Sequence, residues 1–172
     1  MIITTSRRPS TRSRRICKEL HDVIPLSCYI VRGKKGMREL IQSSVEKGAD
    51  RILLVHAAGD TCTLLFYEEW NLLGSMKCSA VLRRELGMGR IRPIQEDLPF
   101  VLLTSDPGAG NIAGLFGAEF RGSDCELHGD PTAYLHYHQD VLDFYRLDIS
   151  DGPVGPRIIV REINYEGYSG NN

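Results

Sequence analysis

The sequence predicts an α/β fold with two halves, each made of a small sheet and packed helices. Short apolar segments typical of β-strands alternate with segments of helical spacing over about the first sixty residues, in the order strand, helix, strand, helix, strand. A strand followed by a helix and further strands returns from residue 99 onward. A chain of 172 residues can form one domain with a single core, or two small halves that share one.

In the first half, the opening strand and helix are the best defined elements. Residues 2–5 form a short apolar strand. Apolar side chains recur at helical spacing over 11–24, with Ser10 or Thr11 as the N-cap and Pro25 as the stop signal. The remaining elements expected in this half are a strand at 28–32, a helix at 37–47 and strands at 51–57, 61–67 and 75–82.

Residues 83–97 are short, charged and turn-like, which indicates a junction between the halves. The elements expected after the junction are a strand at 99–105, a turn at 106–110, a helix at 111–120 and strands at 133–138, 141–149 and 157–165. Over 133–149 the choice between helix and strand stays open. The tail 167–172, with Gly, Ser and Asn, is expected to fray.

Positive charge is concentrated at the beginning of a nearly neutral chain. Residues 1–38 carry ten Lys or Arg and two acids, a net charge of +8, whereas the other residues carry eleven Lys or Arg and twenty acids. Such asymmetry indicates a polyanion-binding end on an otherwise acidic body, although a solvated charge run is the alternative.

Several of these cations work slightly against the predicted helix. Arg12, Arg14 and Arg15 fall in the first turns of 11–24, where the helix macrodipole is already positive. A bound anion would resolve this conflict, because helix N-termini present N–H groups and the adjacent hydroxyls suit phosphate. The basic loop 33–36 also follows a strand, so both basic segments are expected at one rim of the sheet. Many separate cations favour a nucleic-acid backbone over one small phosphate.

Three arginines provide a direct test of this interpretation. Arg7, Arg8 and Arg12 should be exposed, because unpaired arginine is almost never buried. Replacing the three together with Ala should then leave thermal stability unchanged or slightly raised. Lys34 should lie on the same face as Arg8.

A Gly-rich segment at 105–117 offers a different function. It stands between a strand and a helix, but it lacks the Lys-Ser/Thr that completes a P-loop. A turn with close backbone approach is the favoured interpretation. A nucleotide-binding enzyme that uses 106–114, or a protein-interaction module without RNA binding, are the alternatives. We find no nucleophile, base and orienting residue that could be assembled into a catalytic set, and therefore expect no enzyme activity and no cofactor.

Cysteine and histidine patterns predict no metal site. The five cysteines are odd in number and widely spaced, which argues against a disulfide framework and a zinc finger, and four of them fit buried apolar positions. His136 and His138 share one face of a strand and could join His128 or Asp140, but no further ligand has characteristic spacing. Trp70 is expected in the core, with base stacking as the alternative. No secretory signal or membrane span is evident, so a cytoplasmic location is expected.

The segment "ITTSRRPSTRSRRICKELHDVIPLSCYIVRGKKGMRELIQSSVEKGADRILLVH" resembles the opening of the Brix-domain proteins, which assist ribosome assembly. Thr-Ser-Arg-Arg-Pro-Ser at 5–10, Arg-Gly-Lys at 32–34 and Val-Gly-Pro-Arg at 154–157 carry the resemblance. It covers most of the chain, is strong in 3–56 and 154–163, and is closest to the small archaeal type.

This resemblance implies one Brix domain over 1–172, with a first half at about 1–86 and a second at about 98–166. The halves would be related by a pseudo-two-fold axis, each similar to the anticodon-binding domain of class II aminoacyl-tRNA synthetases. Partners would be ribosomal RNA or its precursor. The second half departs from relatives with a basic Phe-Arg-His-His-like stretch, because its nearest match at 135–140 has no Arg. The acidic second half is therefore an alternative contact for other ribosome assembly proteins.

The charge distribution and the resemblance together predict a set of RNA-binding residues. These are Ser6, Arg7, Arg8, Ser10, Thr11, Arg12, Arg14, Arg15, Lys18, Arg32, Lys34, Lys35 and Arg157.

Overall fold

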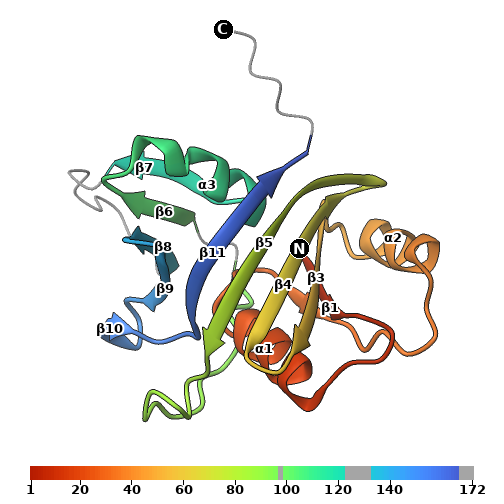
Figure 1. Cartoon of the computed structure of the whole chain (residues 1–172), viewed down its shortest axis with the longest axis horizontal. Coiled ribbons are helices and arrows are strands. Elements are labelled where there is room, and N and C mark those ends of the chain that lie inside the picture. Colours follow the sequence, from red (N-terminus) through yellow and green to blue (C-terminus); the bar gives the residue numbers. More distant parts are fainter. Residues whose placement is uncertain (97–98, 123–132, 167–172) are drawn as a thin grey trace, which may run out of the picture.

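The computed structural model describes residues 1–96, 99–122 and 133–166, and its strands form one mixed sheet (Figure 1). The strands before the junction are β1 (Ile2–Thr5), β2 (Cys28–Tyr29), β3 (Arg51–Ala58), β4 (Thr61–Glu68) and β5 (Asn71–Val81). Those after it are β6 (Phe100–Thr104), β7 (Glu119–Gly122), β8 (Ala133–His138), β9 (Val141–Arg146), β10 (Ser150–Pro153) and β11 (Arg157–Tyr165). The helices are α1 (Thr11–His21), α2 (Met37–Glu46), the 3-10 turn η1 (Pro107–Ala109) and α3 (Gly110–Phe116).

Most predicted elements are confirmed, but several have different bounds. The strand expected at 75–82 begins earlier, at Asn71. The strand expected at 28–32 ends at Tyr29. The chain then turns at Gly33, which has a φ of +55°. The helix expected at 11–24 ends at His21. The helix expected at 111–120 ends at Phe116, because Gly117 adopts a left-handed conformation, and strand β7 follows. The open region 133–149 contains two strands, and the second ends at Arg146 rather than at 149.

The two halves of the sheet repeat the same pairing order. In the first half, β1 pairs in parallel with β2 and β3, and β3, β4 and β5 follow antiparallel. In the second half, β6 pairs in parallel with β7 and β8, and β8, β9 and β11 follow antiparallel. The halves join where β5 pairs antiparallel with β11, from Val81 opposite Arg157 to Gly74 opposite Tyr165.

One hydrophobic core lies under this joint. Buried side chains from α1, α3 and eight strands of both halves form a single cluster, which places both helices on the same face of the sheet. Phe116 of α3 stands between Phe66 of β4 and Phe144 of β9, with ring centroids 5.0 and 6.1 Å apart. A smaller cluster forms on the other face of the sheet, where Leu40 of α2 packs with Ile52 of β3. This follows from the alternation of side chains along a strand.

The carboxyl end of α1 is tied to both halves. The Arg83 guanidinium, after β5, pairs with the Asp22 carboxylate, and the Arg83 N–H donates to Glu19 Oε2 at 2.8 Å. From the second half, Arg146 Nη1 donates to the Asp22 carbonyl at 3.2 Å. Burial raises the pKa of Glu19, because its carboxylate is partly shielded from water at this contact.

A glycine lets the second half approach this end of α1. A Cβ on Gly155 would lie 2.6 Å from the Phe144 Cβ and 3.1 Å from Cγ1 of Val23. Such a contact requires the backbone or the neighbouring side chains to shift. Close packing therefore explains why glycine, and not a larger residue, stands at position 155 in the motif Val-Gly-Pro-Arg.

We expect Gly155→Ala to destabilise the protein by about 1–3 kcal/mol, because the added methyl group overpacks this contact. Gly152→Ala in the same segment is the matched control, because its Cβ would meet only Ser150 Oγ, at 3.6 Å. Urea unfolding of both variants measures the difference. Equal stability of the two would contradict the packing role of Gly155.

Candidate nucleic-acid interface

The first basic segment lies at the carboxyl ends of β1 and β3. The Ser6 N–H donates to the Val55 carbonyl at 3.1 Å, which continues the pairing of the two strands. Of the two predicted N-cap candidates, Ser10 is the N-cap of α1: its Oγ accepts from the Ser13 N–H at 3.0 Å and donates to the Ala57 carbonyl at 3.1 Å. Two of the predicted phosphate-binding hydroxyls, those of Ser6 and Ser10, are therefore engaged in the structure, since Ser6 Oγ also bonds His56 Nδ1.

The second basic segment is a tight turn beside the first. The Lys35 N–H donates to the Arg32 carbonyl at 3.0 Å, and Arg32 Nε donates to the Lys35 carbonyl at 3.1 Å. Burial lowers the pKa of Arg32, and the nearby charge of Arg7 lowers it further. Arg7 Nη2 would lie 4.0 Å from a Cβ on Gly36. The two basic segments are therefore neighbours at this rim of the sheet.

Helix α1 turns further cations outward between these loops and the junction. Its inner face consists of Ser13, Ile16, Cys17 and Leu20, all fully or almost fully buried. The opposite face carries Arg14, Arg15 and Lys18, which are exposed. The cations of both loops and the helix that make no ion pair among the described residues are Arg7, Arg8, Arg14, Arg15, Lys18, Lys34 and Lys35. We call these seven residues the N-terminal basic surface.

Three predicted contacts have structural partners instead. Arg12 is half-buried, not exposed as predicted, because its guanidinium pairs with Glu85 at 2.9 Å and donates to the Ala80 carbonyl. This pairing lowers the pKa of Glu85. Arg32 is only 7% exposed. Arg157 donates to both carboxylate oxygens of Asp143 at 2.9 Å, on the second half of the sheet. Thr11 is exposed at the start of α1.

Sequence reasoning missed two kinds of surface residue. Trp70 is 62% exposed at the turn between β4 and β5, so the prediction of a core position is wrong. The turn consists of Glu69 and Trp70, directly after Glu68, and Glu69 has a φ of +51°, which is typical of a hairpin tip rather than of a core strand. The second kind is the exposed arginines of the junction. The sequence signal for them was the presence of four arginines among residues 83–92.

The Gly-rich segment does not form a phosphate cradle. Asp106 Oδ1 accepts from the Gly108 N–H at 2.8 Å, so a carboxylate occupies the place where a P-loop would hold phosphate. The adjoining cavity, of about 150 Å³, includes Asn111 and Leu115 of α3 and Glu68 of β4. This geometry disfavours the nucleotide-binding alternative.

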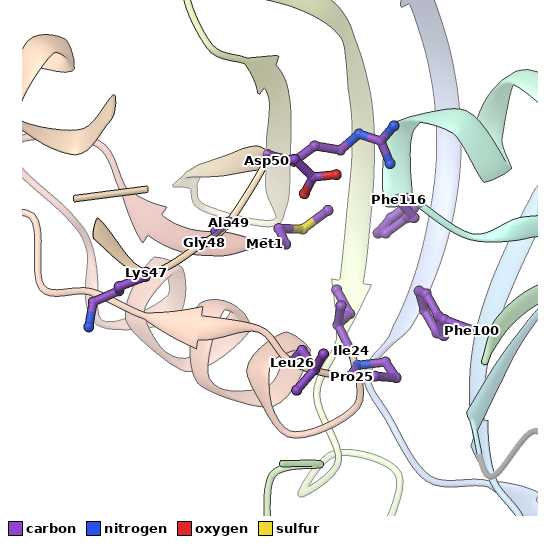
Figure 2. Close-up of a pocket in the computed structure, with 12 residues that line it drawn as sticks. Met1, Ile24, Pro25, Leu26, Lys47, Gly48, Ala49, Asp50, Phe100 and Phe116 are labelled. Carbon is purple, nitrogen blue, oxygen red and sulfur yellow. The ribbon is translucent and has the colours of Figure 1, made fainter. Parts of the chain in front are cut away.

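A larger cavity of about 600 Å³ opens at the rim opposite the basic loops, where β1 and β3 begin (Figure 2). Phe100 and Phe116 from the second half face Leu26 and Pro25 across it (Figure 2). Asp50 contributes a carboxylate to the lining, so the cavity lacks the uniform positive charge of the N-terminal basic surface.

Histidines and cysteines in the described ranges do not converge. No group of three or more His, Cys, Asp or Glu is placed there to hold a metal ion. The rings of His136 and His138 lie 6.2 Å apart, and His128 falls outside the described residues, as does Cys125. Cys17, Cys62 and Cys78 are buried and Cys28 is half-buried, and burial raises the pKa of the Cys17 thiol. Of the helices that the structure describes, none has the length and apolar character needed to cross a membrane.

Several archaeal proteins have similar sequences or folds. A "probable Brix domain-containing ribosomal biogenesis protein" of Pyrococcus horikoshii is 36% identical, over 94% of this chain and 83% of its own length. A crystal structure of a probable ribosomal biogenesis protein from Aeropyrum pernix has a TM-score of 0.74 at 23% identity, covering 94% of each chain. The archaeal Imp4-like protein Mil has a TM-score of 0.64 at 17% identity, covering 96% of this chain and 99% of its own. No family model matches the sequence.

The two crystal structures share the mixed sheet and helices seen here, and so support the fold alone. The sequence match to the Pyrococcus protein covers 94% of this chain. On this identity, the chain belongs to the Brix-domain family of ribosomal biogenesis proteins.

Proposed function

We propose that this chain is a non-catalytic RNA-binding protein that holds ribosomal RNA or its precursor during ribosome biogenesis in the cytoplasm. The observation that carries the proposal is the N-terminal basic surface, whose seven cations have no carboxylate partner among the described residues. The names of the relatives, which refer to ribosomal biogenesis, supply the process.

The arrangement of the cations suits a polyanion with several phosphates. They come from two adjacent loops and one outward helix face, so they are spread over a surface rather than gathered around one point. Each contact with a phosphate releases a condensed counterion, which gives affinity without base specificity. Specificity for one RNA would then come from the shape that matches this surface.

We also infer that the two halves are related by a pseudo-two-fold axis and that each resembles the anticodon-binding domain of class II aminoacyl-tRNA synthetases. The repeated pairing order of the strands supports the inference. In such an arrangement the N-terminal basic surface belongs to one half only, because the second half, residues 98–166, carries eleven acids and only four Lys or Arg.

A second partner class, other ribosome assembly proteins, is proposed for the second half. Leu147 and Ile149, at the turn between β9 and β10, are 43% and 44% exposed. Neighbouring exposed apolar side chains are typical of protein contacts.

Binding of an in vitro transcribed ribosomal RNA should depend steeply on salt. Each phosphate contact contributes a slope of about −0.7 to −0.9 to log affinity against log salt. With at least four contacts, affinity should fall about a thousandfold over a tenfold rise in salt. Fluorescence titrations at several salt concentrations measure the slope, and a flat response would rule out binding through this surface.

The cluster of arginines should separate into binding and structural members. Arg7→Ala/Arg8→Ala should keep the melting temperature and weaken RNA binding, because both side chains are exposed and without carboxylate partners. Arg12→Ala should lower the melting temperature by about 2–4 °C, since it loses an ion pair and a hydrogen bond worth about 1 kcal/mol together. This corrects the expectation that replacing all three is neutral for stability.

Thermal unfolding and RNA titration of both variants test this separation. Lys47→Gln/Arg161→Gln, with the same loss of charge at exposed positions away from the basic loops, is the matched control for binding. Unchanged RNA affinity in Arg7→Ala/Arg8→Ala would contradict a binding role for the first loop.

A further inference from the structure

We propose that residues 83–92, the first part of the junction between the halves, are a second RNA-contacting element that extends the N-terminal basic surface across α1. The inference rests on the proposed function, since it assumes that the ligand is RNA. The residues that would make the contacts are Arg84, Arg90 and Arg92, all of which are exposed.

The start of the junction is a hydrogen-bonded turn rather than an extended linker. The Glu85 and Leu86 N–H groups donate to the Leu82 carbonyl, and the Met88 N–H donates back to the Arg83 carbonyl at 2.8 Å. Glu85 Oε2 accepts from the Leu82 N–H at 2.8 Å. Arg84 therefore projects from a backbone that is held in one conformation.

Side chains fasten this turn along one side of α1. Glu85 pairs with Arg12 in the first turn of the helix, and Arg83 reaches Glu19 and Asp22 in its last turn. The contacted positions, 12, 19 and 22, are seven and three residues apart, and these spacings fall on one face of a helix. Figure 1 shows the chain passing beside α1 after it leaves β5.

The far end of the junction is also anchored. Arg146 of β9 donates to the Arg92 carbonyl with the same Nη1 that reaches the Asp22 carbonyl. Ile94 is 5% exposed, and Ile91 packs against the main core. The backbone that carries Arg90 and Arg92 is therefore held in place by the packing of Ile91 and Ile94.

The charges on the junction are not neutralised locally. The nearby carboxylates of Glu85 and Asp22 are taken by Arg12 and Arg83, and Glu19 accepts a backbone N–H. Asp148 is paired with Arg146. Arg84, Arg90 and Arg92 make no ion pair with any carboxylate in the part of the chain described, although Glu96 is exposed nearby in sequence.

The position of these arginines makes the basic surface continuous. The outer face of α1, with Arg15 and Lys18, adjoins the junction, which contacts Arg12 and Glu19 of the same helix. Arg15 is near enough to Glu85 to lower its pKa, which places it beside the junction. Since a helix with side chains is about 10–12 Å wide, cations on both sides of α1 are spaced for separate phosphates of a folded RNA.

A protein partner fits this segment less well than RNA. Protein interfaces depend on buried aromatic or aliphatic anchors. Within the described part of the junction, residues 83–96, no large apolar side chain is strongly exposed: Leu86, Met88 and Ile91 are half-buried. Exposed guanidinium groups without apolar neighbours suit phosphates.

Arg84→Gln/Arg90→Gln tests the proposal by salt-dependent titration with in vitro transcribed ribosomal RNA. Both residues lie outside the ion pairs that hold the junction, so thermal unfolding should stay as in the wild type. The slope of log affinity against log salt should become shallower by about 1.4–1.8, and affinity near 0.1 M salt should fall roughly tenfold or more. The matched control Lys47→Gln/Arg161→Gln loses the same charge and should keep the wild-type slope.

The outcomes distinguish this inference from the proposed function. If the wild type binds with a steep slope, Arg7→Ala/Arg8→Ala weakens it, and Arg84→Gln/Arg90→Gln behaves like the control, the junction is not an RNA contact. If the wild type itself shows no salt-dependent RNA binding, the proposed function fails. Capture of a protein whose binding is lost in Arg84→Gln/Arg90→Gln, with RNA binding intact, would also overturn the inference.

Discussion

The antiparallel pairing of β5 with β11 is the constraint on which the rest of the structure depends. It joins two sheets of the same pairing order into one, so that α1 and α3 share a single core. It also separates β5 from the next strand in sequence, β6, by β11, β9 and β8. With about 4.8 Å between neighbouring strands, the chain must travel about 19 Å to reach β6. The junction crosses this distance by running along α1 and ending against Arg146.

This route decides which charges are left for a ligand. The acids beside α1 are used to fasten the junction: Asp22 holds Arg83, and Glu85 holds Arg12. Each pair removes one arginine from the candidate interface and one acid that would repel phosphate. What remains on the outer side is almost entirely positive, although the whole chain has a net charge of −1. Electrostatic attraction at this surface is therefore stronger than composition indicates.

The family-like motifs carry structural as well as functional information. Gly155 is required by the close approach of Phe144 and Val23, and Arg157 by the carboxylate of Asp143. Arg32 stabilises its own turn. By contrast, Arg7 and Arg8 have no such partners in the described structure. Among the motif residues that resemble the family, burial and ion pairing thus separate those that maintain the fold from those that are available to a ligand.

The sequence by itself determined the local elements and the concentration of charge. Apolar spacing and the Ser10 cap predicted α1, apolar runs predicted the central strands, and counting charges located the basic end, because these signals depend only on neighbouring residues. Only the tertiary structure decided which cations are free to bind. Partners distant in sequence engage Arg12 and Arg157, and a contact within its own turn engages Arg32. The arginines of the junction become candidates for RNA contact only because the fold places them beside α1. Such pairings arise from the crossing of the chain between halves, which no local pattern encodes.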